Sequence, residues 1–295
     1  MSIGAQSGLR AQYQQLGQVI DRQAWRWAKS GTRQWRLAEA TRHLPLSTST
    51  RYRYLLVDRP NYAYGVHRAV TAAANLLFPA VTVVEFGVAG GNGLVALEQH
   101  ARLIGRAHGV AVKVIGFDTG KGMRPPVDYR DQPHFWAEGN YRMNEAALRA
   151  RLRSADVIIG DVGSTLPRYL DEHRTALAEA PVGFVSFDLD YYSSTMHAFD
   201  LFRAPDISHL LPRVGCYFDD TIFSIPAVGE LRAIADFNDE KPSERAIGPI
   251  CGLRAGLPFD PPWADQFFEA HSFGHALYAR TSGIAPEQLP LDRRR

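Results

Sequence analysis

Acidic side chains follow a series of short apolar segments in this sequence, at the point where each segment ends. The segments have the length and β-branched content of buried strands, and they alternate with helical patterns, which indicates a parallel sheet with crossover helices. Ligands bind at the carboxyl ends of the strands in such a sheet, so we expect these acids to share one cleft. Acids make up 31 of 295 residues, so an acid at all five strand ends would be unusual by chance. They are Glu85 in the first strand, Asp118 after 110–117, Asp161 after 157–159, Asp188 after 183–187, and Asp219 with Asp220 after 215–218.

Three of these carboxylates, Asp188, Asp219 and Asp220, follow the fourth and fifth predicted strands. Carboxylates that converge in one cleft repel one another, and their pKa values rise unless a cation joins them. Oxygen-only ligands favour Mg²⁺, Mn²⁺ or Ca²⁺ over zinc. Such an ion would lower the pKa of a substrate hydroxyl, and Asp188 could take the proton as general base. The alternative is that Asp219 and Asp220 only cap the loop that follows their strand.

A glycine-rich turn, Glu85-Phe86-Gly87-Val88-Ala89-Gly90-Gly91-Asn92-Gly93, follows the first predicted strand. A strand, a glycine turn and a helix in this order present free backbone N–H groups to a nucleotide-like ligand. Ala89 and Asn92 break the dinucleotide spacing Gly-x-Gly-x-x-Gly, and Leu94 stands where a P-loop has lysine. Glu85 would repel a pyrophosphate but would accept a hydrogen bond from an ammonium group or a ribose hydroxyl. We expect Asn92 to cap a helix that ends near Gly109. The alternative is a structural turn found in any α/β protein.

The turn resembles the first motif of class I S-adenosylmethionine (SAM) methyltransferases, acidic-x-Gly-x-x-x-Gly. The resemblance implies a Rossmann-like α/β fold, with a mostly parallel seven-stranded sheet and helices on both faces. Two tail strands, near 245–250 and 267–278, would complete that sheet as a reversed pair. The resemblance also implies that Glu85, Asp118 and Asp161 contact the amino acid moiety, the ribose hydroxyls and the adenine of SAM. With these acids, the SAM site would include Gly87, Gly91 and Asn92. For Asp161, the alternative is a cap for the turn at Thr165.

Two later stretches, Ser186–Thr195 and Gly215–Asp220, resemble the metal-dependent sugar O-methyltransferases of the macrocin O-methyltransferase type. That family shows Asp-x-Asp-x-Tyr-Glu-Ser-Thr and a later Gly-Gly-x-x-x-x-Asp-Asp. Gly116–Gly122 and Gly160–Pro167 resemble two further stretches, and the matches cover residues 83–220 in the same order.

The resemblance implies SAM-dependent, divalent-cation-assisted methyl transfer to a hydroxyl of a small molecule, a sugar or a secondary metabolite. Asp188, Asp219 and Asp220 would then be metal ligands, with Asp188 also the base. The sequence departs from the family at Ser193 (glutamate in the family), at Met123-Arg124-Pro125 and at Val214. Two alternatives remain open: a metal-independent SAM methyltransferase acting on O or N, and a non-catalytic SAM-binding or scaffold protein.

Three parts are expected: a helical extension at 1–78, a SAM-binding domain at 79–284 and a frayed tail at 285–295. Tryptophans among arginines within 9–44 fit a helix packed on the core, a contact between copies in a homo-oligomer, or a surface-binding helix. Pro60 is expected to break any helix, so the helix before the first strand is predicted at 64–77. The aromatic-rich loop at 120–141 is predicted to be an ordered lid.

Composition limits the remaining possibilities. A net charge of +2 argues against coating nucleic acid. Cys216 and Cys251 have no metal-site spacing, which favours a reduced, cytoplasmic compartment. We find no apolar run of membrane-spanning length and no signal-peptide pattern. We therefore expect a small-molecule partner rather than a nucleic acid or a membrane.

Overall fold

The computed structural model describes residues 44–223, 225–257 and 261–280. The Trp/Arg-rich N-terminal pattern up to residue 43 and the predicted tail at 285–295 lie outside the described residues. The described chain divides into two compact units. The smaller comprises 44–57, 252–257 and 261–264, and the larger comprises 58–251 with 265–280.

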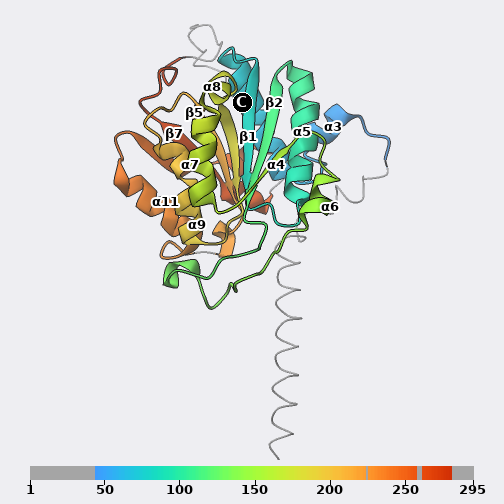
Figure 1. The fold of residues 1–295 in the computed structure, drawn as a ribbon. Coiled ribbons are helices and arrows are strands. Elements are labelled where there is room, and N and C mark those ends of the chain that lie inside the picture. The colour runs from blue at the N-terminus through green and yellow to red at the C-terminus, as the bar shows by residue number, and fades with distance from the viewer. Residues whose placement is uncertain (1–43, 224, 258–260, 281–295) are drawn as a thin grey trace, which may run out of the picture. The chain divides into compact units, whose positions relative to one another are not determined.

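One sheet forms the centre of the larger unit, with strands in the order β3-β2-β1-β4-β5-β7-β6 (Figure 1). The first five strands are parallel, and β7 runs antiparallel to both of its neighbours. This confirms the mostly parallel seven-stranded sheet. The two tail strands pair antiparallel to each other as expected, but only β7 is reversed relative to the five parallel strands. The strands are β1 (Ala80–Phe86), β2 (Ala111–Asp118), β3 (Asp156–Ile159), β4 (Val182–Phe187), β5 (Leu210–Phe218), β6 (Arg245–Pro249) and β7 (Phe267–Ser272).

Helices cover both faces of this sheet because alternate strand residues point to opposite sides (Figure 1). Val84 and Phe86 of β1 join the apolar core formed with α7, α9, α10 and α11, whereas Glu85 points to the face covered by α4 and α5. The covering helices are α4 (Pro60–Asn75), α5 (Asn92–His108), α7 (Val162–Glu172), α9 (Tyr192–Ala198), α10 (Asp200–Arg203) and α11 (Gly229–Glu240). The shorter elements are α3 (Thr48–Arg53), α6 (Glu145–Arg149), α8 (Arg174–Glu179), α12 (Leu253–Gly256), η1 (Tyr129–Asp131), η2 (Thr221–Phe223) and η3 (Pro262–Gln266).

Helix α4 begins earlier than predicted. Pro60 does not break the helix but is its first residue, where its missing N–H has no helical partner to lose and its fixed φ suits the helix. The early start brings Tyr62 into the helix, where its ring packs edge-on against Phe184 of β4 at 6.2 Å. Helix α4 therefore packs with the sheet, although the sequence places it in the extension at 1–78.

Other boundaries also differ from the predictions. The cap of α5 is Gly91, in a left-handed conformation (φ 75°), and Asn92 is the first helical residue, so the prediction that Asn92 caps this helix is wrong. A left-handed residue is easiest for glycine, which has no Cβ. Gly109 (φ 68°) ends the helix as expected. Strand β5 starts at Leu210, before Gly215, and β7 stops at Ser272, short of Tyr278.

The carboxyl ends of the central strands lie level with one another. Gly87 N–H donates to the carbonyl of Phe117 at 2.9 Å, and Asp188 N–H donates to that of Phe86 at 2.9 Å. In the same way, Asp219 N–H donates to the carbonyl of Phe187 at 3.0 Å. This register places the acids that follow neighbouring strands side by side, as the sequence predicts for one cleft.

Within the described residues, no helix combines the length and the apolar character that a membrane crossing needs.

Replacing Gly87 by alanine should destabilise the protein strongly. Gly87 has φ 83°, and an added Cβ would lie 1.8 Å from the backbone oxygen of Asp188. Because backbone and strand register must both shift, we expect a loss of about 3 kcal/mol or more in unfolding free energy, measured by denaturant titration. Gly90→Ala is the matched control, since its Cβ would meet nothing within 4 Å. Equal stability of the two variants would contradict this close packing of the turn on β4.

Candidate active site

Glu85 is a buried acid at the end of β1, on the face covered by α4 and α5. Tyr62 of α4 donates its hydroxyl hydrogen to Oε1 of Glu85 at 2.7 Å, and Ser186 of β4 donates to the Tyr62 oxygen at 2.9 Å. Gly93 leaves room for the acid, because a Cβ there would lie 1.9 Å from the same Oε1. These contacts hold the carboxylate in one orientation.

The second oxygen of Glu85, Oε2, is buried and has no hydrogen-bond partner within the described structure. Burial raises the pKa of Glu85 to about 7, although the Tyr62 hydrogen bond and the charge of Arg59 both lower it. A buried acceptor without a partner is costly and needs an explanation. A ligand that brings an ammonium group or a hydroxyl to Oε2 would supply one.

Asp118 orders the glycine turn. Its Oδ2 accepts hydrogen bonds from the N–H groups of Val88 at 2.9 Å and Ala89 at 2.8 Å, and its Oδ1 accepts from Gly120 N–H at 2.6 Å. Two carboxylate oxygens offer about four acceptor sites, so roughly one site remains for a hydroxyl. Asp118 is partly exposed, so that site can be reached from solvent.

Gly91 and Asn92 belong to the same turn. Arg151, which follows α6, donates to Oδ1 of Asn92 at 2.7 Å and to the carbonyl of Gly90 at 2.9 Å. A Cβ on Gly91 would lie 2.1 Å from Leu148, so the turn also packs tightly against α6. The side chain of Asn92 is thus engaged with the protein, and a contact between Asn92 and SAM stays a prediction.

Asp161 caps helix α7. Its Oδ1 accepts the N–H of Gly163 at 2.9 Å, and its Oδ2 accepts from Arg124 Nη1 at 2.5 Å. The capping alternative is therefore realised in the structure, through the Gly163 amide. Contact with adenine stays a prediction for this residue.

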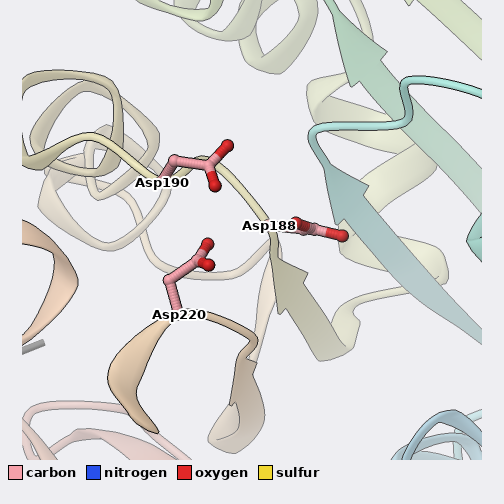
Figure 2. A group of neighbouring side chains, drawn as sticks. All are labelled: Asp188, Asp190 and Asp220. Atoms are coloured by element: carbon pink, nitrogen blue, oxygen red, sulfur yellow. The ribbon is translucent and has the colours of Figure 1, made fainter. Parts of the chain in front are cut away.

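Three carboxylates meet beyond the ends of β4 and β5: those of Asp188, Asp190 and Asp220. One oxygen from each lies within 4.8 Å of the others. Figure 2 shows Asp190 and Asp220 reaching toward each other from the loops after β4 and β5, with Asp188 at the tip of β4. Asp190 and Asp220 are buried, while Asp188 is partly accessible. The set differs in one member from that proposed from the sequence, because Asp190 stands in place of Asp219.

Asp219 and Asp220 have different partners, although they are consecutive in the chain. Asp219 Oδ1 accepts the hydroxyl of Tyr217 at 2.8 Å. The backbone N–H of Asp220 donates to Oε2 of Glu230, a fully buried acid at the start of α11, at 3.1 Å. Burial and the neighbouring Asp220 raise the pKa of Glu230.

The acid cluster concentrates negative charge. Removal from water raises the pKa of Asp188 well above its usual value, and the charges of Asp219 and Asp220 raise it further. A carboxylate with a raised pKa is a better proton acceptor near neutral pH. A cation in the cluster would relieve the repulsion that causes the shift.

The predicted lid at 120–141 is fastened to the wall of the site. Asp131, fully buried, accepts hydrogen bonds at 2.8 Å from Val127 N–H within the loop and from both the N–H and the hydroxyl of Ser193 in α9. Arg130 makes a second contact between the loop and α9, because its guanidinium carbon lies 4.0 Å from the centre of the Tyr192 ring. Ser193 is the position where the resembled family has glutamate, and a glutamate there would repel Asp131.

Tyr141 ends this loop beside the acid cluster. It is half-exposed, and its φ of 61° is unusual for a bulky residue. Its ring packs against Trp136 at 6.1 Å. Burial raises the pKa of Tyr141 to about 12, and the charges of Asp190 and Asp220 contribute to the increase.

Several polar groups in the site were not identified from the sequence: Arg59, Tyr62, Asp190 and Glu230. The sequence does carry a signal for Asp190, because Asp188-Leu189-Asp190 matches the Asp-x-Asp of the resembled family. Arg59 and Tyr62 had none, since the helix that carries Tyr62 and places Arg59 at its start was predicted to begin after both.

Replacing Glu85 by glutamine should change how stability depends on pH. The folded protein holds the Glu85 proton up to about pH 7, whereas the unfolded chain releases it near its usual value of 4.5. The contribution of Glu85 to stability is therefore complete below the unfolded pKa and falls by about 3 kcal/mol as the pH rises through the folded pKa. Chemical unfolding of ligand-free wild type and Glu85→Gln, from about pH 5 to pH 8, measures the difference. Parallel curves would contradict a raised pKa.

Replacing Asp131 by alanine should loosen the loop at 120–141. The amide of Val127 and both donors of Ser193 would lose their acceptor, so we expect local opening to become easier by about 2–3 kcal/mol. Hydrogen exchange should accelerate in the loop but not in β1 or β4. Glu138→Ala, an exposed charge change on the same loop, is the control. Equal exchange in both variants would show that Asp131 does not hold the loop.

No family model matches this chain, and no curated protein matches its sequence. Solved structures similar to it include CalS11, described as a calicheamicin methyltransferase, at 19% identity, covering 82% of this chain and 91% of that one, with a TM-score of 0.47. An apo structure of CalS11, described as TDP-rhamnose 3'-O-methyltransferase, has 18% identity, 82% and 93% coverage and a TM-score of 0.43. An O-methyltransferase from Bacillus cereus in complex with SAH has 13% identity, 79% and 95% coverage and a TM-score of 0.39. These likenesses are weak, so the case for function rests on the geometry of the site.

Proposed function

We propose that this protein is a SAM-dependent, divalent-cation-assisted O-methyltransferase acting on a small hydroxylated molecule, such as a sugar or a secondary metabolite. One observation carries the proposal. The glycine turn lies beside a cluster of three carboxylates at the ends of neighbouring strands, and the buried Glu85 before the turn has one oxygen without a hydrogen-bond partner among the described residues. The turn suits a methyl donor, and the cluster suits the activation of a hydroxyl.

The residues of the turn fit SAM. Glu85 offers Oε2 to the donor's ammonium group, and Asp118 has acceptor capacity left for a ribose hydroxyl. Gly87 and Gly91 let the turn pack closely on Asp188 and Leu148, and a Cβ at Gly90 would meet nothing within 4 Å, so the turn is open there. Asp161 lies farther along the same edge, after β3, and we assign it to the adenine end.

The carboxylate cluster fits a hard divalent cation. Two oxygens bound to one cation lie at most about twice the metal–oxygen bond length apart, roughly 4 Å for Mg²⁺ and 5 Å for Ca²⁺. The cluster's oxygens lie within 4.8 Å of one another, so they fit Ca²⁺ as they stand and Mg²⁺ after a small approach of the side chains. Asp188, Asp190 and Asp220 would hold the ion, with Asp219 as a further candidate from the sequence. When bound, the ion lowers the pKa of a substrate hydroxyl.

The chain's own residues would do the rest. Asp188 is the member of the cluster that adjoins the donor turn, so it is placed to accept the hydroxyl proton. Methyl transfer is a displacement in line with the departing sulfur, so holding oxygen and methyl group in line is the main task. Tyr141 and the loop held by Asp131 form the wall against which we place the acceptor.

Calorimetric titration with SAM and then with Mg²⁺ tests both halves of the proposal. Wild type should bind SAM, and the SAM complex should bind Mg²⁺. Asp190→Ala and Asp220→Ala should weaken Mg²⁺ binding by about tenfold or more, because each removes a charged ligand. Asp219→Ala should weaken it less, since the Asp219 carboxylate is bonded to Tyr217. Asp239→Ala, an exposed acid on α11, is the control for charge.

Each result has a distinct meaning. If wild type does not bind SAM, the central proposal is lost. If SAM binds but Mg²⁺, Mn²⁺ and Ca²⁺ do not, the cation is excluded and a metal-independent methyltransferase becomes the better description. If Asp219→Ala removes metal binding and Asp190→Ala does not, the ligand set taken from the sequence is right.

A further inference from the structure

Arg59 lies at the donor end of the site, and within the described part of the chain it has no carboxylate partner. It immediately precedes α4 and is partly buried. Its guanidinium carbon lies 5.2 Å from the centre of the Tyr62 ring. Among residues 44–223, 225–257 and 261–280, no carboxylate lies within ion-pair distance of this guanidinium. A partly buried charge with no direct partner is costly to keep, so its retention needs a reason.

Tyr62 lies between Arg59 and Glu85 and contacts both. The ring of Tyr62 faces Arg59, and its hydroxyl binds Oε1 of Glu85 at 2.7 Å. Oε2 of Glu85 remains without a hydrogen bond. Tyr62 thus contacts the Arg59 guanidinium through its ring and the Glu85 carboxylate through its hydroxyl. The other oxygen of that carboxylate can accept a further hydrogen bond.

The backbone holds Arg59 in place. Arg59 has a left-handed conformation, with φ 43°, which is uncommon for a residue with a side chain. Pro60 restricts the chain on one side, and on the other the carbonyl of Asp58 lies 2.8 Å from Nε2 of His100 in α5. Strain of this kind persists where the surroundings enforce it, and it is common at ligand sites.

The charges that act on Arg59 are mostly negative. Burial lowers the pKa of Arg59, but the Tyr62 hydroxyl and the carboxylates of Glu85, Asp188 and Asp219 more than offset this, so the guanidinium stays charged. None of those three carboxylates pairs with it directly. The position is therefore open to a carboxylate brought by a ligand.

We propose that Arg59 and Glu85 together bind the zwitterionic amino acid end of the methyl donor. Arg59 takes the donor's carboxylate, and Glu85 takes its ammonium group. The inference rests on the proposed function, and it adds a residue from outside the glycine turn to the donor site. A guanidinium matches a carboxylate in charge and shape, and Oε2 of Glu85 accepts what an ammonium donates.

Three nucleosides separate the parts of this recognition: S-adenosylhomocysteine (SAH), its decarboxylated analogue that keeps the amine, and 5'-methylthioadenosine, which lacks both charged groups. Wild type should bind SAH at least about tenfold more tightly than the decarboxylated analogue. Arg59→Met should remove most of that preference and leave the affinity for the analogue and for methylthioadenosine unchanged. Arg59→Lys should restore part of it.

Arg102→Met, which removes an exposed cation from α5, is the matched control and should behave as wild type. Thermal unfolding of each variant checks the fold. If Arg59→Met does not fold, the preference of wild type and of Arg59→Lys for SAH over its decarboxylated analogue still tests the inference. Equal weakening of all three ligands by Arg59→Met would make Arg59 a structural counter-ion and overturn the inference.

Other outcomes separate this inference from the function. If wild type binds SAH and its decarboxylated analogue equally, the inference fails while a SAM site remains. If wild type binds none of the three nucleosides, the proposed function and the inference fail together.

Discussion

The arrangement of this site depends on the contact between the first turn and the fourth strand. Gly87 lies so close to the backbone oxygen of Asp188 that no side chain fits between them. Hydrogen bonds between neighbouring strand ends hold β1, β2, β4 and β5 in the same register. The donor turn and the acid that we assign as base are therefore parts of one rigid edge. Their separation is a property of the sheet, and it does not need to be established when ligands bind.

Charge is the second constraint on the site. Five acids, Glu85, Asp188, Asp190, Asp219 and Asp220, lie at or near the ends of three adjacent strands, and burial or mutual repulsion raises the pKa of Glu85 and Asp188. Such an edge is stable only if cations offset part of the repulsion. The protein itself provides Arg59. The sulfonium and ammonium groups of SAM and a divalent ion would provide the remainder.

Much of this arrangement could be predicted from the sequence, because buried strands and strand-end acids are local patterns and a parallel sheet brings them together. Residues whose position depends on an unusual backbone angle were missed. Asp190 enters the cluster through a left-handed conformation, with φ 58°, and Arg59 precedes its helix in another. Residue type favours Asn92 as a helix cap, but Gly91 is the cap because the turn requires a positive φ. Hydrogen-bond partners far apart in the chain could not be predicted either, since nothing in the sequence shows that Ser193 binds Asp131.

The loop between β2 and α6 closes on itself before it joins the rest of the protein. Met123 N–H donates to the carbonyl of Asn140, and Gly139 N–H donates to the carbonyl of Met123, each at 2.9 Å. A chain whose two ends meet can change length between them at a small entropic cost. The segment from Arg124 to Glu138 can therefore change in length at a small cost, provided that a replacement keeps the contact of Asp131 with Ser193 in α9. Under the function that we propose, the choice of acceptor would then be free to change in this segment while the residues of the glycine turn stay the same.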